Sequence, residues 1–450
     1  MIISQIMYIY VMFIEFQIGN FRSFRDIQRF SLQASPLRPN DSGLQEDNVF
    51  ENSGFRLLKS KAIFGSNASG KSNLGKAFGA FTLMVSKSVS SEDIPKMIWD
   101  ERFKLITEWD MQPVFFQYTF LSEGKVFRYG FQILDAKVSY EWLFGGEKNF
   151  EKEYFMRNPV GLQVNEKQFK GSELFLEQVK KGNNELFRPD SLFLTAAALN
   201  GNKLATKLRD IIRGIITVDG VNDGDALLYA IQVLEKGTEE EKSSIKKLLN
   251  AADTGIEDLE VVEFQEGRSK KQLPKKSQDA INDNSKVLKG LFSLHSRYNE
   301  NGDFYDKISV PFGEWESEGT GKLLSIGALV LEALNNGRTL IVDEFDARFH
   351  SNLTLKILEL FHDKSSNPKN AQLIFVTHDT GLLRRAKLRR DQICFVNKDS
   401  YGLSSIRTLI EYKGVRKDAS YEKEYLNGNY SAIPSLDKID RVIRHKLVKK

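Results

Sequence analysis

The segment FGSNASGKSNL, residues 64–74, constrains the fold of this chain more than any other feature. It fits the pattern G-x-x-x-x-G-K-[ST] and follows the apolar run LLKSKAIF, which we expect to form a short strand. Glycines let successive backbone N–H groups turn inward, and a helix that starts near Gly70 adds the positive end of its dipole. The pattern predicts a phosphate-binding loop, with a Gly- and Ser-rich surface turn as the alternative.

The residues of this loop have separate expected roles. Lys71 would reach the β- and γ-phosphates of a nucleotide, and the Ser72 hydroxyl would bind Mg²⁺. ATP and Mg²⁺ are therefore the predicted cofactors. The residues expected to surround the phosphates are Gly65, Ser66, Asn67, Ala68, Ser69, Gly70, Lys71, Ser72 and Asn73.

Length and composition are those of an ordinary globular protein. A chain of 450 residues has room for two or three domain-sized units, and 41% apolar with 28% charged residues is typical of this class. The net charge of +4 is too small to indicate nucleic-acid binding by itself. The single cysteine, Cys394, cannot form an intrachain disulfide, and its setting in DQICFVNK indicates a buried strand. We expect a cytoplasmic location.

The N-terminal run MIISQIMYIYVMF is apolar but lacks the features of a targeting segment. It has no basic region and no small-residue cleavage site, and the uncharged run of 14 residues before Glu15 is too short to span a bilayer. We therefore expect no membrane association. Met7 and Met12 suggest that part of this run precedes the natural start.

Hydrophobic periodicity divides the remaining chain into blocks. Residues 12–64 are expected to form an edge strand, a polar loop and the strand before the phosphate loop, followed by a helix over 70–90. Residues 113–144 are rich in Phe, Tyr and Val and predict an antiparallel meander. Residues 165–252 show helical periodicity, as in GNKLATKLRDIIRGI and EEEKSSIKKLLNAA, and LEVVEF predicts a further strand.

These blocks give a predicted domain organisation. The fold class is α/β: a P-loop head with a mixed sheet, an antiparallel β subdomain and an inserted helical subdomain. We assign residues 1–160 to an N-terminal lobe, 161–290 to a helical insert with a basic loop, and 291–450 to a C-terminal lobe.

A second motif, RTLIVDEFDARFH, places two carboxylates after a buried strand. Parallel strands deliver their carboxyl ends to the ligand crevice. There Asp343 can hold Mg²⁺ together with Ser72, and Glu344 can orient or deprotonate the attacking water. Taken alone, the pair could equally be the solvated end of a strand.

Two further segments complete the predicted site. AQLIFVTHDTGLL is an apolar strand that ends near His378, which can hydrogen-bond a γ-phosphate and sense its loss. WESEGTGKLLSIGALVLEAL places Ser317 and Gly319 at the start of a long helix running to about Leu334, an N-terminus suited to an anion. In ATPases of the ABC class this slot holds the signature motif, which contacts nucleotide on the opposite subunit. A surface histidine and a simple helix cap are the respective alternatives.

The order of these motifs resembles the split ATPase heads of the SMC and RecF type, but no segment sustains the heptads of a long coiled-coil arm. The closer resemblance is to bacterial abortive-infection ATPases of the AbiL/RloA type, which are similar to the OLD family. It rests on NFRSF, AIFGSNASGKSNL, EWLF, AADTGIEDLEV, ESEGT, DEFDARFH, NAQLIFVTHDTGLL, RRDQICFV and YLNGNYSAIP. Arg348, Phe349 and Ser351 stand where that family usually has small residues and proline, so the contacts of this loop are open.

The resemblance implies ATP-dependent dimerised heads that sense infection or DNA and control a toxic partner. The segment that follows His378 is short and contains no Asp-x-Asp pair, so we expect a nuclease or toxin effector to be supplied in trans. DGD at 223–225 is interpreted as a turn. A RecF-like DNA-repair ATPase is the main alternative, and a nucleotide switch that binds a toxin without DNA is another.

Two basic clusters give a less specific signal. Each cluster is either a solvent-exposed run of charges or a surface that contacts DNA phosphates and binds DNA without sequence preference. One cluster contains Arg268, Lys270, Lys271, Lys275 and Lys276, and the other contains Arg441, Arg444, Lys446, Lys449 and Lys450.

Overall fold

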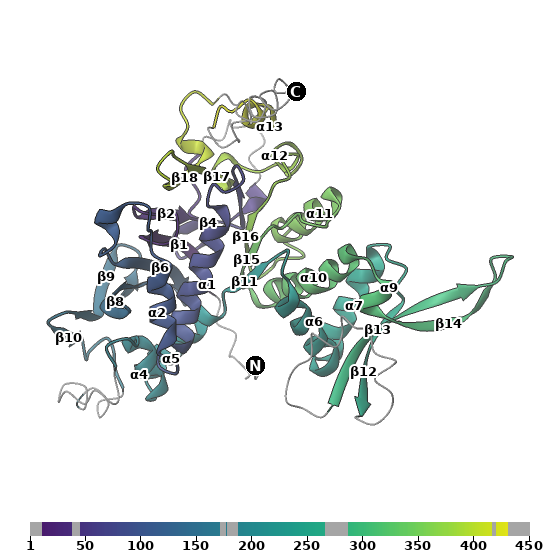
Figure 1. Cartoon of the computed structure of the whole chain (residues 1–450), viewed down its shortest axis with the longest axis horizontal. Coiled ribbons are helices and arrows are strands. Elements are labelled where there is room, and N and C mark those ends of the chain that lie inside the picture. Colours follow the sequence, from purple (N-terminus) through teal and green to yellow (C-terminus); the bar gives the residue numbers. More distant parts are fainter. Residues whose placement is uncertain are drawn as a thin grey trace, which may run out of the picture.

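The computed structural model describes residues 11–37, 46–171, 177, 188–265, 287–415 and 420–430. Both basic clusters, for which a solvated charge run and a DNA footprint were the two interpretations, lie outside these residues. Figure 1 shows two large sheets with helix α1 (Lys71–Lys87) between them, and a smaller sheet at the far side of the molecule. Within the described part of the chain, no helix combines the length and apolarity needed to cross a membrane.

The first large sheet is antiparallel and has seven strands in the order β10-β9-β8-β7-β6-β1-β2. It confirms the predicted meander and extends it beyond residue 144. The prediction of an edge strand after residue 12 is wrong, because β1 pairs with β6 on one side and β2 on the other. The strands are β1 (Val11–Gly19), β2 (Gln28–Ser31), β6 (Val114–Ser122), β7 (Lys125–Leu134), β8 (Lys137–Glu147), β9 (Phe150–Asn158) and β10 (Gly161–Val164).

The second large sheet is mostly parallel, with the order β11-β15-β16-β5-β17-β18. Only β18 runs antiparallel to its neighbour. LLKSKAIF is not one strand: the chain leaves the two-stranded β3–β4 sheet at Leu58 and enters the parallel sheet at Ser60. The strands are β3 (Val49–Asn52), β4 (Phe55–Leu58), β5 (Ser60–Phe64), β11 (Ile216–Asp219), β15 (Thr339–Asp343), β16 (Gln372–Val376), β17 (Ile393–Lys398) and β18 (Ser404–Thr408).

Strand β11 corrects the helical interpretation of residues 165–252. The helix over this stretch ends at Arg213, and Gly214 follows as its C-cap. Residues 216–219 then pair in parallel with β15. Four residues are too few to show a strand period between two strongly amphipathic helices, which is why the pattern missed it.

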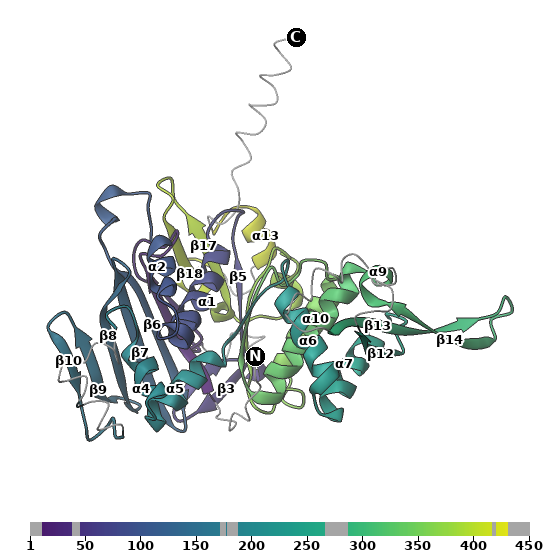
Figure 2. The same ribbon diagram turned by 60° about the horizontal axis from the view of Figure 1, so that its bottom comes forward.

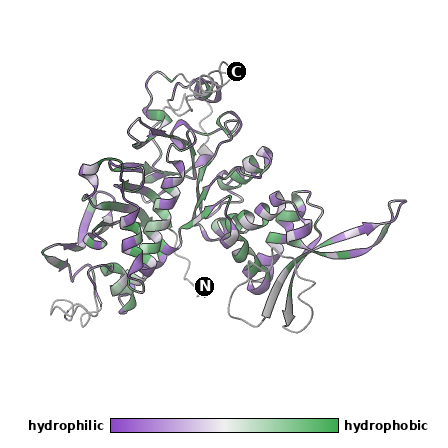
Figure 3. Cartoon of the chain, viewed as in Figure 1, coloured by the Kyte–Doolittle hydropathy of each residue, from purple (hydrophilic) through white to green (hydrophobic). Residues whose placement is uncertain are grey.

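Helix α1 joins the two large sheets through a continuous apolar core. On its sheet-facing side, the rings of Phe78 and Phe16 stack with centroids 4.1 Å apart, and those of Phe81 and Phe131 with centroids 5.5 Å apart. The same core includes Ile63 of the parallel sheet. Figure 3 shows hydrophobic residues along α1 and α10, whereas the projecting β13–β14 hairpin is largely hydrophilic.

The remaining helices pack against these layers and against one another. Helix α10 packs against α6 and α7, and the three-stranded sheet β12-β13-β14 adjoins them (Figure 2). The strands of the small sheet are β12 (Asp258–Gln265), β13 (Val287–Tyr298) and β14 (Phe304–Pro311). The α-helices other than α1 are α2 (Asp93–Asp100), α4 (Phe193–Leu199), α5 (Lys203–Arg213), α6 (Gly224–Lys236), α7 (Glu239–Ala251), α9 (Phe312–Trp315), α10 (Glu318–Asn336), α11 (Ser351–His362), α12 (Leu382–Arg385) and α13 (Tyr421–Leu426).

The chain therefore has an α/β fold with a mixed sheet, an antiparallel β subdomain and an inserted helical part. Residues of the middle segment contribute to more than one layer: α4 and α5 contact α1, whereas α6 and α7 contact α10. The domain boundaries at residues 160 and 290 remain a prediction.

A buried carboxylate fixes helix α4 to the antiparallel sheet. Glu141 on β8 is fully buried and accepts hydrogen bonds from the N–H groups of Phe193 (2.6 Å) and Leu194 (2.9 Å) and from the Tyr129 hydroxyl (2.9 Å). Burial raises the pKa of Glu141, while the charge of Arg157 and the N–H donors act in the opposite direction. The residue thus caps a buried helix N-terminus, which supplies a structural reason for the glutamate of EWLF.

We expect Glu141→Ala to lower the free energy of unfolding by about 3 kcal/mol or more, because it leaves buried donors unpaired. Melting temperature measured by differential scanning fluorimetry tests this. Glu147→Ala is the matched control, since Glu147 lies at the exposed end of the same strand. An equal effect of the two substitutions would contradict the capping role.

Candidate nucleotide-binding site

The predicted phosphate loop connects the carboxyl end of β5 to the first residue of α1. Residues 65–70 form the loop, and Ser72 and Asn73 lie in the first turn of the helix. Lys71 is buried, and its ammonium donates to the carbonyls of Gly65 (2.7 Å) and Ser66 (2.8 Å). Burial lowers the pKa of Lys71, whereas nearby carboxylates, Glu344 first among them, act to raise it.

Hydroxyl groups from distant segments hold this loop in place. The Ser404 hydroxyl, at the start of β18, donates to the carbonyl of Ser69 (2.6 Å) and lies 2.7 Å from the Ser23 hydroxyl. Asn73 donates from its side chain to the same Ser23 hydroxyl (2.7 Å). Ser23 belongs to NFRSF, so this motif acts structurally on the phosphate loop. Sequence reasoning quoted the motif but did not assign this contact.

The parallel sheet brings a carboxylate to the loop. Asp343 ends β15, and the Ser72 side chain lies near enough to its carboxylate to act toward lowering the pKa of Asp343. Asp219, at the end of β11, stands directly opposite Asp343 in the strand register. Sequence reasoning missed Asp219, although GIITVD repeats on a smaller scale the pattern of an apolar strand that ends in a carboxylate.

The surroundings of Asp343 suit a divalent cation. Its Oδ1 is buried and has no hydrogen-bond partner among the described residues. Burial raises the pKa of Asp343 and the Ser72 hydroxyl opposes this, while the charges of Glu344 and Asp219 raise it further. Because an unpaired buried oxygen is costly, a cation held by Asp343 and Ser72 would remove both the desolvation penalty and the charge repulsion.

Glu344 and His378 lie together beyond the strand ends. The Nε2 atom of His378 is 3.7 Å from Oε1 of Glu344, and both side chains are partly exposed. The backbone N–H of His378 donates to the carboxylate of Asp346 (3.0 Å). Glu344 has a φ of 52°, a left-handed conformation that is rare for a residue with a side chain. Such strain persists only where surrounding contacts fix it.

Lys322 supplies part of that restraint. From α10, its ammonium donates to the carbonyls of Glu344 (2.9 Å) and Phe345 (3.1 Å), and it also bonds the carbonyl of Ala347. Burial lowers the pKa of Lys322 to about 8. The sequence places this lysine five residues after Ser317, but nothing in the pattern distinguishes it from a surface lysine.

Ser317 and Gly319 lie on a different element from the other candidate residues, at the N-terminus of α10. Ser317 caps α10, with its hydroxyl accepting from the N–H of Thr320 (3.0 Å). The adjacent Glu318 pairs with Arg348 at 3.2 Å. Within the described ranges, neither Ser317 nor Gly319 makes a hydrogen bond to the phosphate loop. Lys71, Ser72, Asp343, Glu344 and His378 thus form one cluster, and the helix N-terminus forms a second element.

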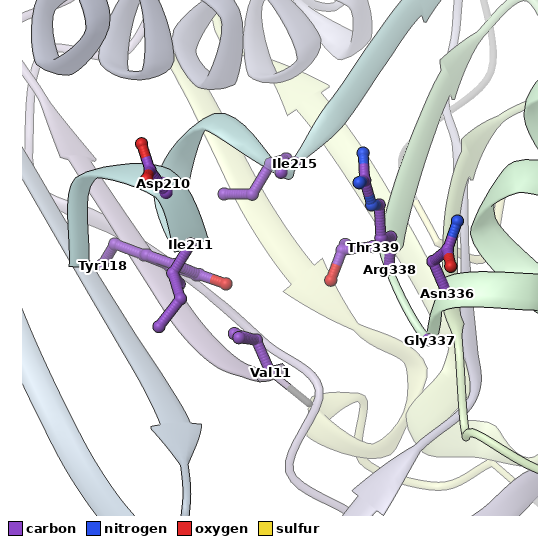
Figure 4. A pocket seen from close by; sticks show the side chains of 10 residues that line it. Val11, Tyr118, Asp210, Ile211, Ile215, Asn336, Gly337, Arg338 and Thr339 are labelled. Atoms are coloured by element: carbon purple, nitrogen blue, oxygen red, sulfur yellow. The ribbon is translucent and has the colours of Figure 1, made fainter. Parts of the chain in front are cut away.

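A small cavity lies at the opposite ends of the parallel strands. Figure 4 shows the Tyr118 and Thr339 side chains extending toward the space beside helix α5. The Tyr118 hydroxyl is buried and unpaired among the described residues. With a volume of about 60 Å³, the cavity holds only a few water molecules. Thr339 begins β15 and Asp343 ends it, so this cavity is not part of the candidate site.

Strand order, phosphate loop and strand-end carboxylates together are those of an α/β P-loop fold. Residues 62–384 match the family described as "AAA domain, putative AbiEii toxin, Type IV TA system", and the chain belongs to this family. An SMC head domain from Thermotoga maritima aligns with 88% of this chain and 98% of that chain, at 12% identity and a TM-score of 0.36. No curated protein matches the sequence.

The geometry of Gly70 gives a direct test of the loop. Gly70 has a φ of 103°, and an added Cβ would lie 2.4 Å from the Ser404 hydroxyl and 2.6 Å from that of Ser23. Because both backbone and packing oppose a side chain, we expect Gly70→Ala to weaken ATP binding at least tenfold, roughly 1.4 kcal/mol or more. Binding of a fluorescent ATP analogue measures this.

Gly79→Ala is the matched control on the same helix. A Cβ at Gly79 would meet no atom of the described structure within 4 Å, and alanine favours a helix interior. This variant should bind ATP normally and be slightly more stable. Unchanged affinity in Gly70→Ala would show that the loop does not surround the phosphates.

Proposed function

We propose that this chain is the ATP-binding and ATP-hydrolysing head of an abortive-infection system that defends bacteria against phage. The observation that carries the proposal is the convergence of Lys71, Ser72, Asp343, Glu344 and His378 at one edge of the parallel sheet. The family description, which names a toxin–antitoxin class, and the resemblance to AbiL/RloA-type ATPases support the defence role.

In this proposal, each clustered residue has a separate task. Lys71 exchanges its two loop carbonyls for phosphate oxygens when ATP binds. Ser72 and Asp343 would hold Mg²⁺, which would supply neutralisation of the phosphate charge. Glu344 accepts a proton from the attacking water or orients it, and His378 contacts the γ-phosphate from the neighbouring strand.

We further propose that two heads pair around ATP. Ser317 and Gly319 lie at a helix N-terminus whose N–H groups and dipole suit an anion, but within the described ranges they make no hydrogen bond to their own phosphate loop. The ion pair between Glu318 and Arg348 places this N-terminus beside the turn that follows Glu344. A second copy would therefore meet both elements at once. The dimer would in turn control a nuclease or toxin supplied by another gene.

A RecF-like role in DNA repair is the alternative that shares the same head. The two proposals make the same biochemical predictions for ATP and differ in the cell. Direct binding of DNA rests on basic residues outside the described ranges, so it remains a prediction from the sequence alone.

Substitutions of Lys71 and Glu344 should separate ATP binding from ATP hydrolysis. Lys71→Ala should lose ATP binding, because a buried cation that faces the phosphates is removed. Glu344→Gln should bind ATP but hydrolyse it about a hundredfold or more slowly, as expected for loss of a general base. Steady-state ATPase assays and equilibrium binding measure the two effects. Glu359→Gln, on α11, is the control, and full turnover by Glu344→Gln would remove Glu344 from catalysis.

The same Lys71→Ala variant tests the biological role. In bacteria that carry the gene with its natural neighbours, we expect the variant to restore phage plaque formation and leave resistance to ultraviolet light unchanged. Lost ultraviolet resistance with unchanged plaque counts would instead favour the repair role.

A mixture of two inactive variants tests whether the nucleotide site is shared between two subunits. Lys71→Ala and Ser317→Arg subunits should each be inactive alone, but a mixture should recover activity because each mixed dimer contains one intact site. The measurement is ATPase activity as a function of mixing ratio. Full activity of the wild-type protein as a monomer at high dilution would exclude the shared site.

A further inference from the structure

A cavity on the antiparallel subdomain has features that the ATPase function does not use. Its volume is about 330 Å³, within the range of small-molecule pockets. It lies where the β6–β7 turn, strand β9, the segment at residues 167–168 and the start of helix α5 meet. The residues that line it are Ser122, Glu123, Lys125, Phe127, Tyr154, Lys167, Gln168, Leu204 and Lys207.

The rim of this cavity is cationic. Lys125, Lys167 and Lys207 come from three different segments, and Glu123 is the only carboxylate among the lining residues. Lys207 is only 21% exposed and pairs with Glu123, whose side chain is 61% exposed. Because Glu123 is well hydrated, it can leave this pair for water at little cost when another anion approaches.

The floor is apolar and contains one unused polar group. Phe127 and Tyr154 are buried and form an edge-to-face ring pair with centroids 6.1 Å apart. Ser122, the last residue of β6, is 1% exposed, and its hydroxyl has no hydrogen-bond partner among the described residues. A buried hydroxyl without a partner costs stability, so it calls for a group that can satisfy it.

We infer that this cavity binds a small phosphorylated molecule, as a second anion site separate from the phosphate loop. Lysines from three segments line this concave surface, and lysine ammonium groups bind phosphate as point charges. The Ser122 hydroxyl can donate to a phosphate oxygen. The aromatic floor excludes water and accommodates the non-phosphate part of the ligand. The inference does not depend on ATP hydrolysis, because none of these residues belongs to the candidate nucleotide site.

The experiment uses the full chain carrying Lys71→Ala, so that the phosphate loop contributes little. Inorganic phosphate and AMP are titrated separately by isothermal titration calorimetry. We expect binding of at least one of them, and tighter binding of AMP would assign part of the affinity to the apolar floor. Adding Lys125→Met and Lys207→Met should weaken binding by about tenfold for each lysine, since a charge-assisted hydrogen bond is lost at each.

One further variant tests the Ser122 hydroxyl, and a double variant serves as a control for loss of charge. Ser122→Ala leaves all charges in place and should weaken binding several-fold without lowering the melting temperature, because it removes an unpaired buried group. Lys242→Met with Lys246→Met is the matched control: both lysines lie on α7 in ion pairs and are 23% and 34% exposed. Equal losses in the control and the cavity variants, or no binding of either ligand at millimolar concentration, would overturn the inference.

Discussion

Parallel pairing of β5, β16 and β15 is the constraint on which the rest of this molecule depends. β16 pairs with β5 on one side and β15 on the other, so all three carboxyl ends lie at one edge. The phosphate loop follows β5, Asp343 ends β15, and His378 follows β16. Backbone hydrogen bonds between these strands thus bring together residues that lie far apart in the sequence, and side chains of the motifs then meet, as Glu344 and His378 do at 3.7 Å.

Helix α1 extends this constraint to the antiparallel subdomain. Its N-terminus belongs to the phosphate loop, and its aromatic residues Phe78 and Phe81 fill the space between the two sheets. The NFRSF turn reaches back to the same N-terminus through Ser23. The phosphate loop is therefore connected to the antiparallel sheet both by the packing of α1 and by the Ser23 hydrogen bonds.

Helix α10 makes a comparable connection on the other side. Its N-cap is Ser317, and Lys322 one turn later holds the carbonyls of the strained Glu344 turn. The helix N-terminus that we propose to meet a second subunit is therefore rigidly coupled to the proposed general base. In the proposed dimer, this single helix would link dimer formation to the geometry of hydrolysis.

The sequence by itself determined the phosphate loop, the carboxylates after β15, the histidine after β16 and the antiparallel meander, because each is a local pattern of residue type and period. Tertiary structure alone decided the position of β1 inside its sheet, the strand β11, and the roles of Asp219, Lys322 and Ser404. These depend on pairing between segments far apart in the chain, and a four-residue strand or a single buried lysine leaves no period to detect. The residue types of the candidate site are recognisable in local motifs, whereas the positions of these residues relative to one another depend on long-range pairing of strands.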